Sequence, residues 1–246
     1  MNKKEKVLVL FSGGKDSLLS TCRLVENGYE VHLVTYDNGC VLAIENTLNV
    51  VSRLINRFGE DNIKYAGTHS IRGLWRHFFL PVFNMKPNEI VENYGQLPIS
   101  QLNCLMCRSS MYIYSIVLCK LLEIKKLAEG ARRSQQFAIE LEEMTDLYKT
   151  LLKNYNIDLL LPVIDEKDDF SIQNELLMSG LVPNAMEPQC LLGCPIDKSR
   201  PIDQEIINAV TSFYNKEIAT AIPYLLSEIE KPIAYTLKRK DWNKHY

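Results

Sequence analysis

One stretch near the N-terminus limits what this chain can fold into. Residues 7–11 read Val-Leu-Val-Leu-Phe, an uninterrupted apolar run that is typical of a strand buried on both faces of a parallel sheet. Ser-Gly-Gly-Lys-Asp-Ser follows at once over residues 12–17, and apolar residues then recur at helical spacing as far as Gly28. The sequence therefore predicts a strand, a glycine turn and a helix in immediate succession.

The turn between strand and helix has the chemistry of a phosphate site. Its two glycines can adopt backbone angles that side chains disfavour, and the free N–H groups of the helix start converge with the positive end of the helix dipole. Ser12 and Ser17 add hydroxyl donors. Lys15 adds a positive charge, and Asp16 can hold Mg²⁺ or cap the helix. The alternative is a plain glycine turn in which Ser17 caps the helix.

This hexapeptide resembles the Ser-Gly-Gly-x-Asp-Ser signature of the PP-loop ATP pyrophosphatases. It differs from the Walker loop, in which a hydroxyl residue directly follows the lysine. Enzymes of the PP-loop family cleave ATP between the α- and β-phosphates, attach AMP to an acceptor oxygen and release pyrophosphate. The resemblance implies that ATP and Mg²⁺ bind here, with Lys15 and Asp16 acting in catalysis. The implied nucleotide-binding residues of the loop are Ser12, Gly13, Gly14, Lys15, Asp16 and Ser17.

Periodicity along the rest of the chain predicts an α/β fold, a doubly wound five-stranded parallel sheet. Further strands are expected at 30–36, 63–67, 125–129 and 158–162, and helices at 45–58 and 171–179. Residues 70–101 indicate a helix followed by a long loop. We expect a PP-loop ATP pyrophosphatase domain over 1–200 and a helical C-terminal extension over 201–246, with a break at Pro223. By the resemblance, Thr35 and Tyr36 at the end of the second strand form the adenine seat, although Tyr36 is equally compatible with the core.

Two cysteine pairs form the second informative pattern. Cys104 and Cys107 form a Cys-x-x-Cys expected to open a helix, where thiol pKa values are lowered and both sulfurs can face one metal. Cys190 and Cys194 form a Cys-x-x-x-Cys beside glycine and proline. Four thiolates suit either tetrahedral Zn²⁺ or a [4Fe–4S] cluster. The alternative is that they are unpaired core cysteines, as we expect for Cys22, Cys40 and Cys119.

The cysteine pattern resembles the iron–sulfur tRNA thiolation enzymes of the PP-loop class. In those enzymes three cysteines hold the cluster and the unique iron presents a sulfide. The resemblance implies that three or all four of Cys104, Cys107, Cys190 and Cys194 bind an iron–sulfur cluster, with Zn²⁺ as the alternative. The Cys-x-x-x-Cys spacing of the second pair departs from the two-thiocytidine branch.

A third motif, Gly130-Ala-Arg132-Arg133-Ser-Gln, follows the predicted fourth strand of the sheet. In a doubly wound sheet this turn faces the first strand across the switch point, so it is expected to lie beside ATP. The motif resembles the turn of phosphoadenylylsulfate reductases, which implies that Gly130 lines the nucleotide site and that Arg132 and Arg133 grip pyrophosphate during catalysis. Surface arginines at a helix start are the alternative.

Composition and charge exclude several classes of protein. The net charge is −2 and the pI is about 6.1, so no overall basic field attracts nucleic acid. We find no run of 18 apolar residues and no signal peptide, and the seven cysteines indicate reduced thiols or metal ligands; we expect a cytoplasmic protein without a membrane partner.

These patterns lead to a functional hypothesis. ATP-dependent adenylation of an acceptor oxygen is followed by sulfur transfer, giving a thiolated nucleobase in tRNA or a small metabolite. A sulfur-donor protein and a homodimer are the further partners considered. The rivals are an amidating ligase of the deazaguanine nitrile synthase type with structural zinc, a phosphoadenylylsulfate-reductase-like enzyme, and a non-catalytic nucleotide sensor.

Overall fold

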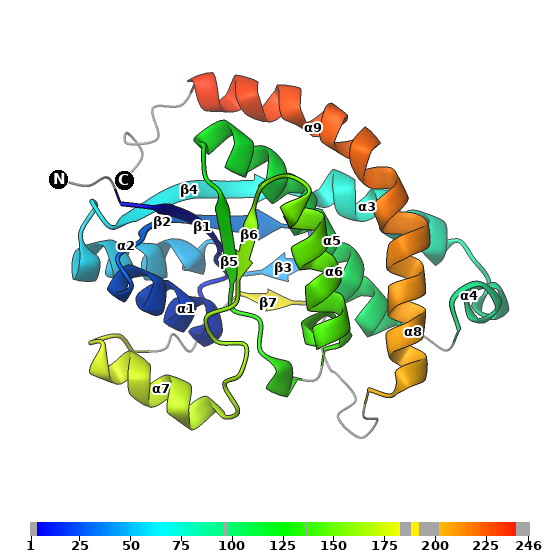
Figure 1. Cartoon of the computed structure of the whole chain (residues 1–246), viewed down its shortest axis with the longest axis horizontal. Helices are drawn as coiled ribbons and strands as arrows, with labels where there is room; N and C mark the ends of the chain where they lie inside the picture. The colour runs from blue at the N-terminus through cyan, green and yellow to red at the C-terminus, as the bar shows by residue number, and fades with distance from the viewer. Residues whose placement is uncertain (1–3, 96–97, 136, 183–187, 192–201, 240–246) are drawn as a thin grey trace.

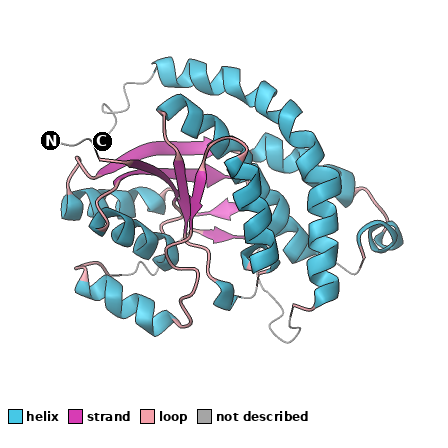
Figure 2. Cartoon of the chain, viewed as in Figure 1, coloured by secondary structure: helices cyan, strands magenta, loops and turns pink. Residues whose placement is uncertain are grey.

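The protein folds around one parallel sheet of five strands (Figures 1 and 2). The computed structural model describes residues 4–95, 98–135, 137–182, 188–191 and 202–239. The strands lie in the order β4-β2-β1-β5-β6, and every neighbouring pair is parallel. Their bounds are β1 Lys6–Leu10, β2 Glu30–Asp37, β4 Ile63–Ser70, β5 Lys126–Glu129 and β6 Asp158–Leu160. The predicted α/β fold is confirmed.

The direction of winding reverses at β1. From β1 the chain runs outward through β2 to β4 and then returns to place β5 and β6 on the other side. The carboxyl ends of β1 and β5 lie side by side, in register at Leu10 and Glu129. In doubly wound sheets ligands bind beyond the strand ends at such a switch point.

Successive side chains of a strand point to opposite faces of the sheet. Each face therefore carries its own apolar core, and helices cover both faces. In β1, Val7 and Val9 pack in a core with α1, α2 and α7, whereas Leu8 and Leu10 pack in a core with α3, α5 and α6. Figure 1 shows these two layers on either side of the strands. The helix bounds are α1 Lys15–Glu26, α2 Asn46–Phe58, α3 Arg72–Phe83, α5 Ile99–Leu122, α6 Glu142–Lys153 and α7 Asp169–Met178.

Helix α5 forms the centre of the second core. Among the described helices it alone is long and apolar enough to cross a membrane, with a mean hydropathy of 1.3 over its most apolar window. Inside the protein, 61% of that window is buried, as expected of a core helix. The Trp75 indole on α3 donates a hydrogen bond to Asn103 on α5 at 3.0 Å, which ties the two helices together.

The region between α3 and α5 differs from the prediction. The long loop expected there is wrong, because Pro87–Tyr94 forms helix α4, with Pro87 at its first position. Helix α5 then begins at Ile99, so the Cys-x-x-Cys motif lies more than one turn inside the helix rather than at its start. A second, antiparallel sheet joins β3 Val41–Leu42 to β7 Gln189–Cys190.

The C-terminal helices pack on α5. Helix α8 Gln204–Phe213 and helix α9 Ala219–Arg239 are joined by a π-helical turn at Tyr214–Ile218. The predicted break at Pro223 is wrong: Pro223 lies inside α9, and the irregular backbone precedes it at the wider π-helical turn. The expected domain boundary at residue 200 lies outside the described residues and stays a prediction.

Candidate active site at the PP-loop

The predicted phosphate loop joins β1 to α1 as expected. Gly13 has a φ of +82°, a backbone conformation that a side chain would strain. The Ser12 and Ser17 hydroxyls lie 3.2 Å apart, and the Gly14 N–H donates to the Ser12 Oγ at 3.3 Å. The Ser17 Oγ donates to the Gly14 carbonyl at 2.9 Å. These local bonds fix a turn at the positive end of the α1 dipole, which suits phosphate.

Gly130 brings the turn after β5 against this loop. A Cβ at Gly130 would lie 2.6 Å from the Ser17 backbone nitrogen and 2.7 Å from the Asp16 carbonyl carbon, closer than side-chain carbons approach. Only glycine permits this contact. The turn therefore lies beside the phosphate loop, as the sequence predicted for Gly130.

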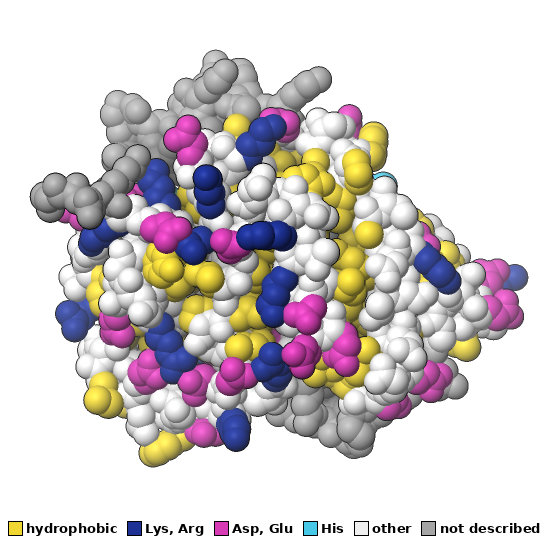
Figure 3. All heavy atoms as spheres, viewed as in Figure 1, with side chains coloured by type: hydrophobic (Ala, Val, Ile, Leu, Met, Phe, Trp, Pro, Cys, Tyr) yellow, Lys and Arg dark blue, Asp and Glu magenta, His cyan; other side chains and the backbone are white. Residues whose placement is uncertain are grey.

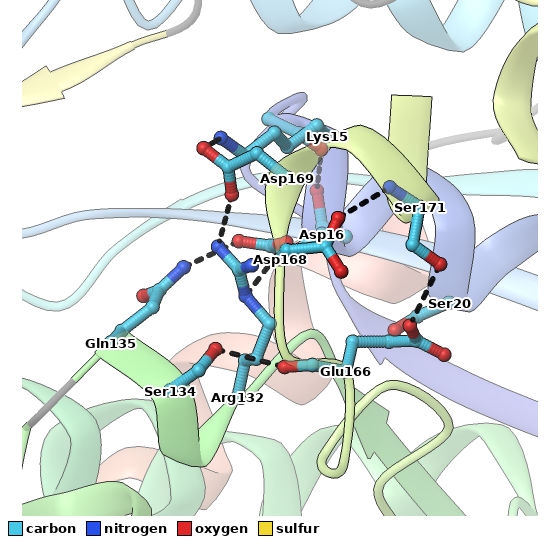
Figure 4. A network of polar contacts seen from close by, with 12 residues as sticks. Lys15, Asp16, Ser20, Arg132, Ser134, Gln135, Glu166, Asp168, Asp169 and Ser171 are labelled. Atoms are coloured by element: carbon cyan, nitrogen blue, oxygen red, sulfur yellow. Dashed lines mark hydrogen bonds and ion pairs between the residues drawn. The ribbon is translucent and has the colours of Figure 1, made fainter. Parts of the chain in front are cut away.

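A chain of opposite charges connects the two turns and the start of α7 (Figure 4). Lys15 Nζ lies 2.5 Å from Asp169 Oδ2, and Arg132 Nη2 lies 2.7 Å from Asp169 Oδ1. Arg132 Nε lies 3.4 Å from Asp16 Oδ1, while the Gln135 amide donates to Asp16 Oδ2 at 2.5 Å. Hydrogen bonds from Lys15 and then Arg132 lower the pKa of Asp169. Burial raises the pKa of Asp16, against the opposing effect of Arg132.

The two predicted arginines differ in position. Arg132 is 5% exposed and faces Asp16 and Asp169, so its guanidinium is held at the site. Arg133 is exposed and pairs with Asp165 on the surface. Neither arginine lines the cavity described next, and a catalytic role for either stays a prediction.

A cavity of about 500 Å³ opens at the switch point, within the range of ligand pockets. The phosphate loop, Gly130 and the backbone end of β2 line one part of it. Thr35 donates its hydroxyl to the Phe11 carbonyl at 2.9 Å, and the Tyr36 hydroxyl lies 2.8 Å from Ser115 Oγ inside the core. The backbone at Thr35 and Tyr36 thus borders the cavity, while the Tyr36 ring contributes to packing.

Three of the four predicted cysteine ligands line this same cavity, namely Cys104, Cys107 and Cys190. Cys194 lies outside the described residues. The expected lowering of the thiol pKa values is wrong, because both cysteines of the Cys-x-x-Cys motif are half-buried inside α5, where loss of water contact disfavours the thiolate. Burial raises the pKa of Cys104 to about 12 and that of Cys107 to about 11. Among the described residues no three Cys, His, Asp or Glu side chains are grouped as metal ligands.

Cys40 is a neighbour of these thiols that the sequence did not indicate. The small β3–β7 sheet places it beside Cys190, with the Leu191 N–H donating to the Cys40 carbonyl at 2.9 Å. Buried Asn38 accepts from the Cys40 N–H at 2.8 Å and donates to Cys107 Sγ at 3.3 Å. Only the tertiary pairing of residues far apart in the chain reveals this contact.

Sequence reasoning also missed two buried acids, Glu129 and Glu140, in the cavity wall. Each is 3% exposed, and Arg108 lies between them. Glu129 is the last residue of β5, directly before the predicted Gly130 turn, so its place at the site was readable from the strand end. Nothing in the local sequence marks Glu140.

The Ser-Gly-Gly-Lys-Asp-Ser turn between β1 and α1, placed at the switch point of a parallel sheet, together with a match to a family model, identifies a PP-loop ATP pyrophosphatase, a class of ATP-utilising enzymes. The family model described as thiamine biosynthesis protein (ThiI) matches residues 2–172, and the chain belongs to this family. A search of curated proteins finds no match.

One solved structure with a TM-score above 0.5 shares the fold, and two others are less similar. A 4-thiouridine synthetase in complex with RNA and ATP is 14% identical, with a TM-score of 0.62 over 92% of this chain and 53% of its own. This chain therefore spans about half the length of that synthetase. The NMN synthetase of Francisella tularensis is 13% identical with a TM-score of 0.49, covering 87% of this chain and 85% of its own. A predicted tRNA methyltransferase subunit from Methanocaldococcus jannaschii is 18% identical with a TM-score of 0.45, covering 76% of this chain and 96% of its own.

Proposed function

We propose that this protein uses ATP to adenylate a carbonyl oxygen of a nucleobase in RNA and then replaces that oxygen with sulfur. The observation that carries the proposal is that the phosphate loop and three cysteine thiols line one cavity. An activated oxygen and a sulfur-bearing group would therefore meet without release of the intermediate. Membership of the ThiI family and a fold shared with a 4-thiouridine synthetase support this chemistry.

ATP is assigned to the phosphate loop and its neighbours. The helix-start N–H groups, Lys15 and Arg132 bind the phosphates and stabilise the charge that develops on the leaving pyrophosphate. Asp16 fits a Mg²⁺ ligand, because its buried Oδ1 accepts no hydrogen bond among the described residues. The full assigned set is Ser12, Gly13, Gly14, Lys15, Asp16, Ser17, Thr35, Tyr36 and Gly130.

The cysteine wall is assigned to sulfur handling. Cys104, Cys107 and Cys190 fit a soft metal in donor type and line the same cavity, although among the described residues they are not grouped around one metal position; Cys194 is the fourth candidate. When bound, a [4Fe–4S] cluster would supply an iron atom able to carry sulfide, whereas Zn²⁺ would be structural. Around this wall the chain contributes apolar Met111, Phe137 and Ile139, which limit water at the reaction centre.

RNA is the proposed acceptor, and a free base is the alternative. On the face seen in Figure 3, acidic and basic side chains are interspersed, so that face presents no single basic field. Because the face in view carries no basic field, we propose that a partner protein or a second copy helps to hold the RNA. A sulfur-donor protein and a cytoplasmic location belong to the same proposal.

The test is pyrophosphate release from ATP and Mg²⁺ with a uridine-containing RNA and sodium sulfide as the sulfur source, followed by mass analysis of the RNA nucleosides. We expect pyrophosphate release that depends on RNA, and a product in which one oxygen is replaced by sulfur. Lys15→Ala should abolish release, whereas Lys149→Ala, at a surface pair with Asp146, should not change it. Pyrophosphate release without sulfur incorporation, in protein that holds one zinc, would favour the amidating ligase.

A further inference from the structure

A buried ionic cluster lies in the cavity wall beside the phosphate loop. It consists of Arg108 on α5, Glu129 at the end of β5, and Glu140 at the end of the short 3₁₀ turn Ala138–Glu140. Arg108 Nη1 bonds to Glu129, and the Tyr112 hydroxyl donates to Glu129 Oε1 at 2.6 Å. Arg108 is thus committed mainly to Glu129. It reaches Glu140 Oε1 only at 3.7 Å.

Neighbouring groups engage only one of the two carboxyl oxygens of Glu140 among the described residues. The Arg132 backbone faces its carboxyl group and favours the ionised form. Its Oε2 is buried and has no hydrogen-bond partner among the described residues. A buried polar atom without a partner costs free energy, so such an atom in a cavity wall indicates a ligand that completes it. Glu140 lines the cavity together with Asp16 of the phosphate loop and Cys104 of the cysteine wall.

The surroundings of Glu140 also suit proton exchange. The charged and titratable groups facing it are Arg108 and Cys104 on α5, Glu129 on β5 and Asp16 on α1. Burial raises the pKa of Glu140 to about 8, and the Arg108 charge opposes this only in part. A carboxyl group with a pKa near neutrality can accept and return a proton during turnover.

We propose that Glu140 binds the ring N–H next to the acceptor carbonyl of the nucleobase and takes its proton during adenylation. The inference rests on the proposed function. In this step the carbonyl oxygen forms a bond to the α-phosphorus, the bond from that phosphorus to the β-phosphate bridging oxygen breaks, and pyrophosphate leaves. The ring nitrogen loses its proton to the Glu140 carboxylate, so the adenylated base is neutral in its ring.

A structural role predicts a different outcome. If Glu140 only holds the Arg132 turn, Glu140→Gln would preserve function, because glutamine keeps the size and an acceptor oxygen facing the Arg132 backbone. If Glu140 is the proton acceptor, Glu140→Gln should lower the single-turnover rate of pyrophosphate release at least 100-fold with ATP affinity unchanged. The wild-type rate should rise with pH up to about 8, in line with the Glu140 pKa. Tyr112→Phe, which alters the same cluster at Glu129, is the matched control and should slow release less than tenfold.

A second measurement needs no turnover. A short RNA containing uridine or 3-methyluridine, which lacks the ring N–H, is titrated into protein loaded with Mg²⁺ and a non-cleavable α,β-methylene ATP analogue. We expect the wild type to bind the uridine RNA at least tenfold more tightly, and Glu140→Ala, which opens room for the methyl group, to lose this preference.

The outcomes separate the two proposals. A wild type that releases no pyrophosphate with RNA contradicts the proposed function, and the binding measurement then decides the role of Glu140 alone. Wild-type protein that binds neither RNA contradicts the proposed RNA acceptor, whereas wild-type protein that binds both equally overturns the assignment of Glu140. A preference that persists in Glu140→Ala overturns it as well, as does full activity of Glu140→Gln.

Discussion

At the scale of single residues, the site depends on a contact between two backbones. Gly130 touches the start of α1 so closely that any Cβ would collide with backbone atoms of Asp16 and Ser17. Arg132 reaches the phosphate loop only because this contact exists. Gly130 therefore affects ligand binding indirectly, because it allows Arg132 to lie beside the phosphate loop.

Gly130→Ala tests this close approach. The added methyl group must push the turn away from α1, so we expect at least a tenfold loss of ATP affinity and about 1–3 kcal/mol of lost stability. Isothermal titration calorimetry and urea unfolding measure the two effects. Gly73→Ala, at a helical glycine with open space around its Cβ, is the control and should leave ATP affinity unchanged. Equal ATP binding in both variants would contradict the argument.

Stability at different pH values reports on Glu140 independently of function. Burial raises its pKa to about 8 from an ordinary value of 4.5, so the folded state holds a proton that the unfolded chain releases. The stabilisation is present below pH 4.5 and is lost as pH rises through about 8. Glu140→Gln should therefore gain about 1–3 kcal/mol relative to wild type between pH 5 and pH 8. Urea unfolding at both values checks this, and parallel curves would show that Glu140 is ionised in the folded protein.

At the residue level the sequence predicted local geometry well, whereas the roles of the predicted site residues stay predictions. Ser12–Ser17 could be identified because strand, turn and helix are continuous in the chain. Glu140 could not, since its burial depends on α5 and β5, which approach it only in the folded state. Cys40 was missed for the same reason: its neighbour Cys190 arrives through a two-stranded sheet that joins distant segments.

At the scale of elements, Arg23 fastens α7 to α1. Its guanidinium bonds both oxygens of Glu175, at 2.7 Å and 2.6 Å, and also reaches Glu166 at 2.6 Å and the Pro162 carbonyl at 2.7 Å. These bonds set the direction of the segment that presents Asp169 to the phosphate loop.

Arg23→Gln should loosen α7. Two carboxylates then lose their forked donor, so we expect about 1–3 kcal/mol of destabilisation and faster hydrogen exchange in α7 than in α2. Hydrogen-exchange mass spectrometry localises the effect. Lys153→Gln, which removes the exposed pair with Asp158, should alter neither quantity measurably.

Element prediction was accurate for strands and weaker for helix boundaries. Buried parallel strands have a strong apolar signature, whereas the sequence around α4 predicts a loop because Pro87, its first residue, and Gly95, which follows it, are both common in turns. Helix α5 begins several residues before the predicted position. The two cysteines of the motif therefore lie inside the helix, and their pKa values are raised rather than lowered.

At the scale of the whole molecule, the C-terminal helices complete a core that begins in the sheet. Val210 and Phe213 on α8 lie in the same apolar cluster as Leu8 of β1 and Leu105 of α5, and all four are at most 1% exposed. The C-terminal extension expected from the sequence therefore packs into the same apolar core as the sheet and α5.

Truncation after residue 203 should therefore prevent stable folding. Removal of α8 and α9 exposes the apolar face of α5, and we expect loss of the cooperative thermal transition and aggregation on purification. Truncation after residue 239, which removes no described residue, is the control. A soluble, cooperatively unfolding fragment 1–203 would instead support an independent domain.

Asp169 has a consequence for the thermodynamics of nucleotide binding. Lys15 and Arg132 already share this carboxylate, so an incoming phosphate replaces one anion by another. When ATP binds, its phosphates take the place of the Asp169 carboxylate beside Lys15 and Arg132. Few cationic groups therefore change from unpaired to paired. The affinity for ATP should accordingly vary little with ionic strength. A single phosphate ion gains little binding free energy by replacing Asp169. A polyphosphate can in addition bind the helix-start N–H groups, so the site in the absence of nucleotide should favour polyphosphates over single phosphate ions.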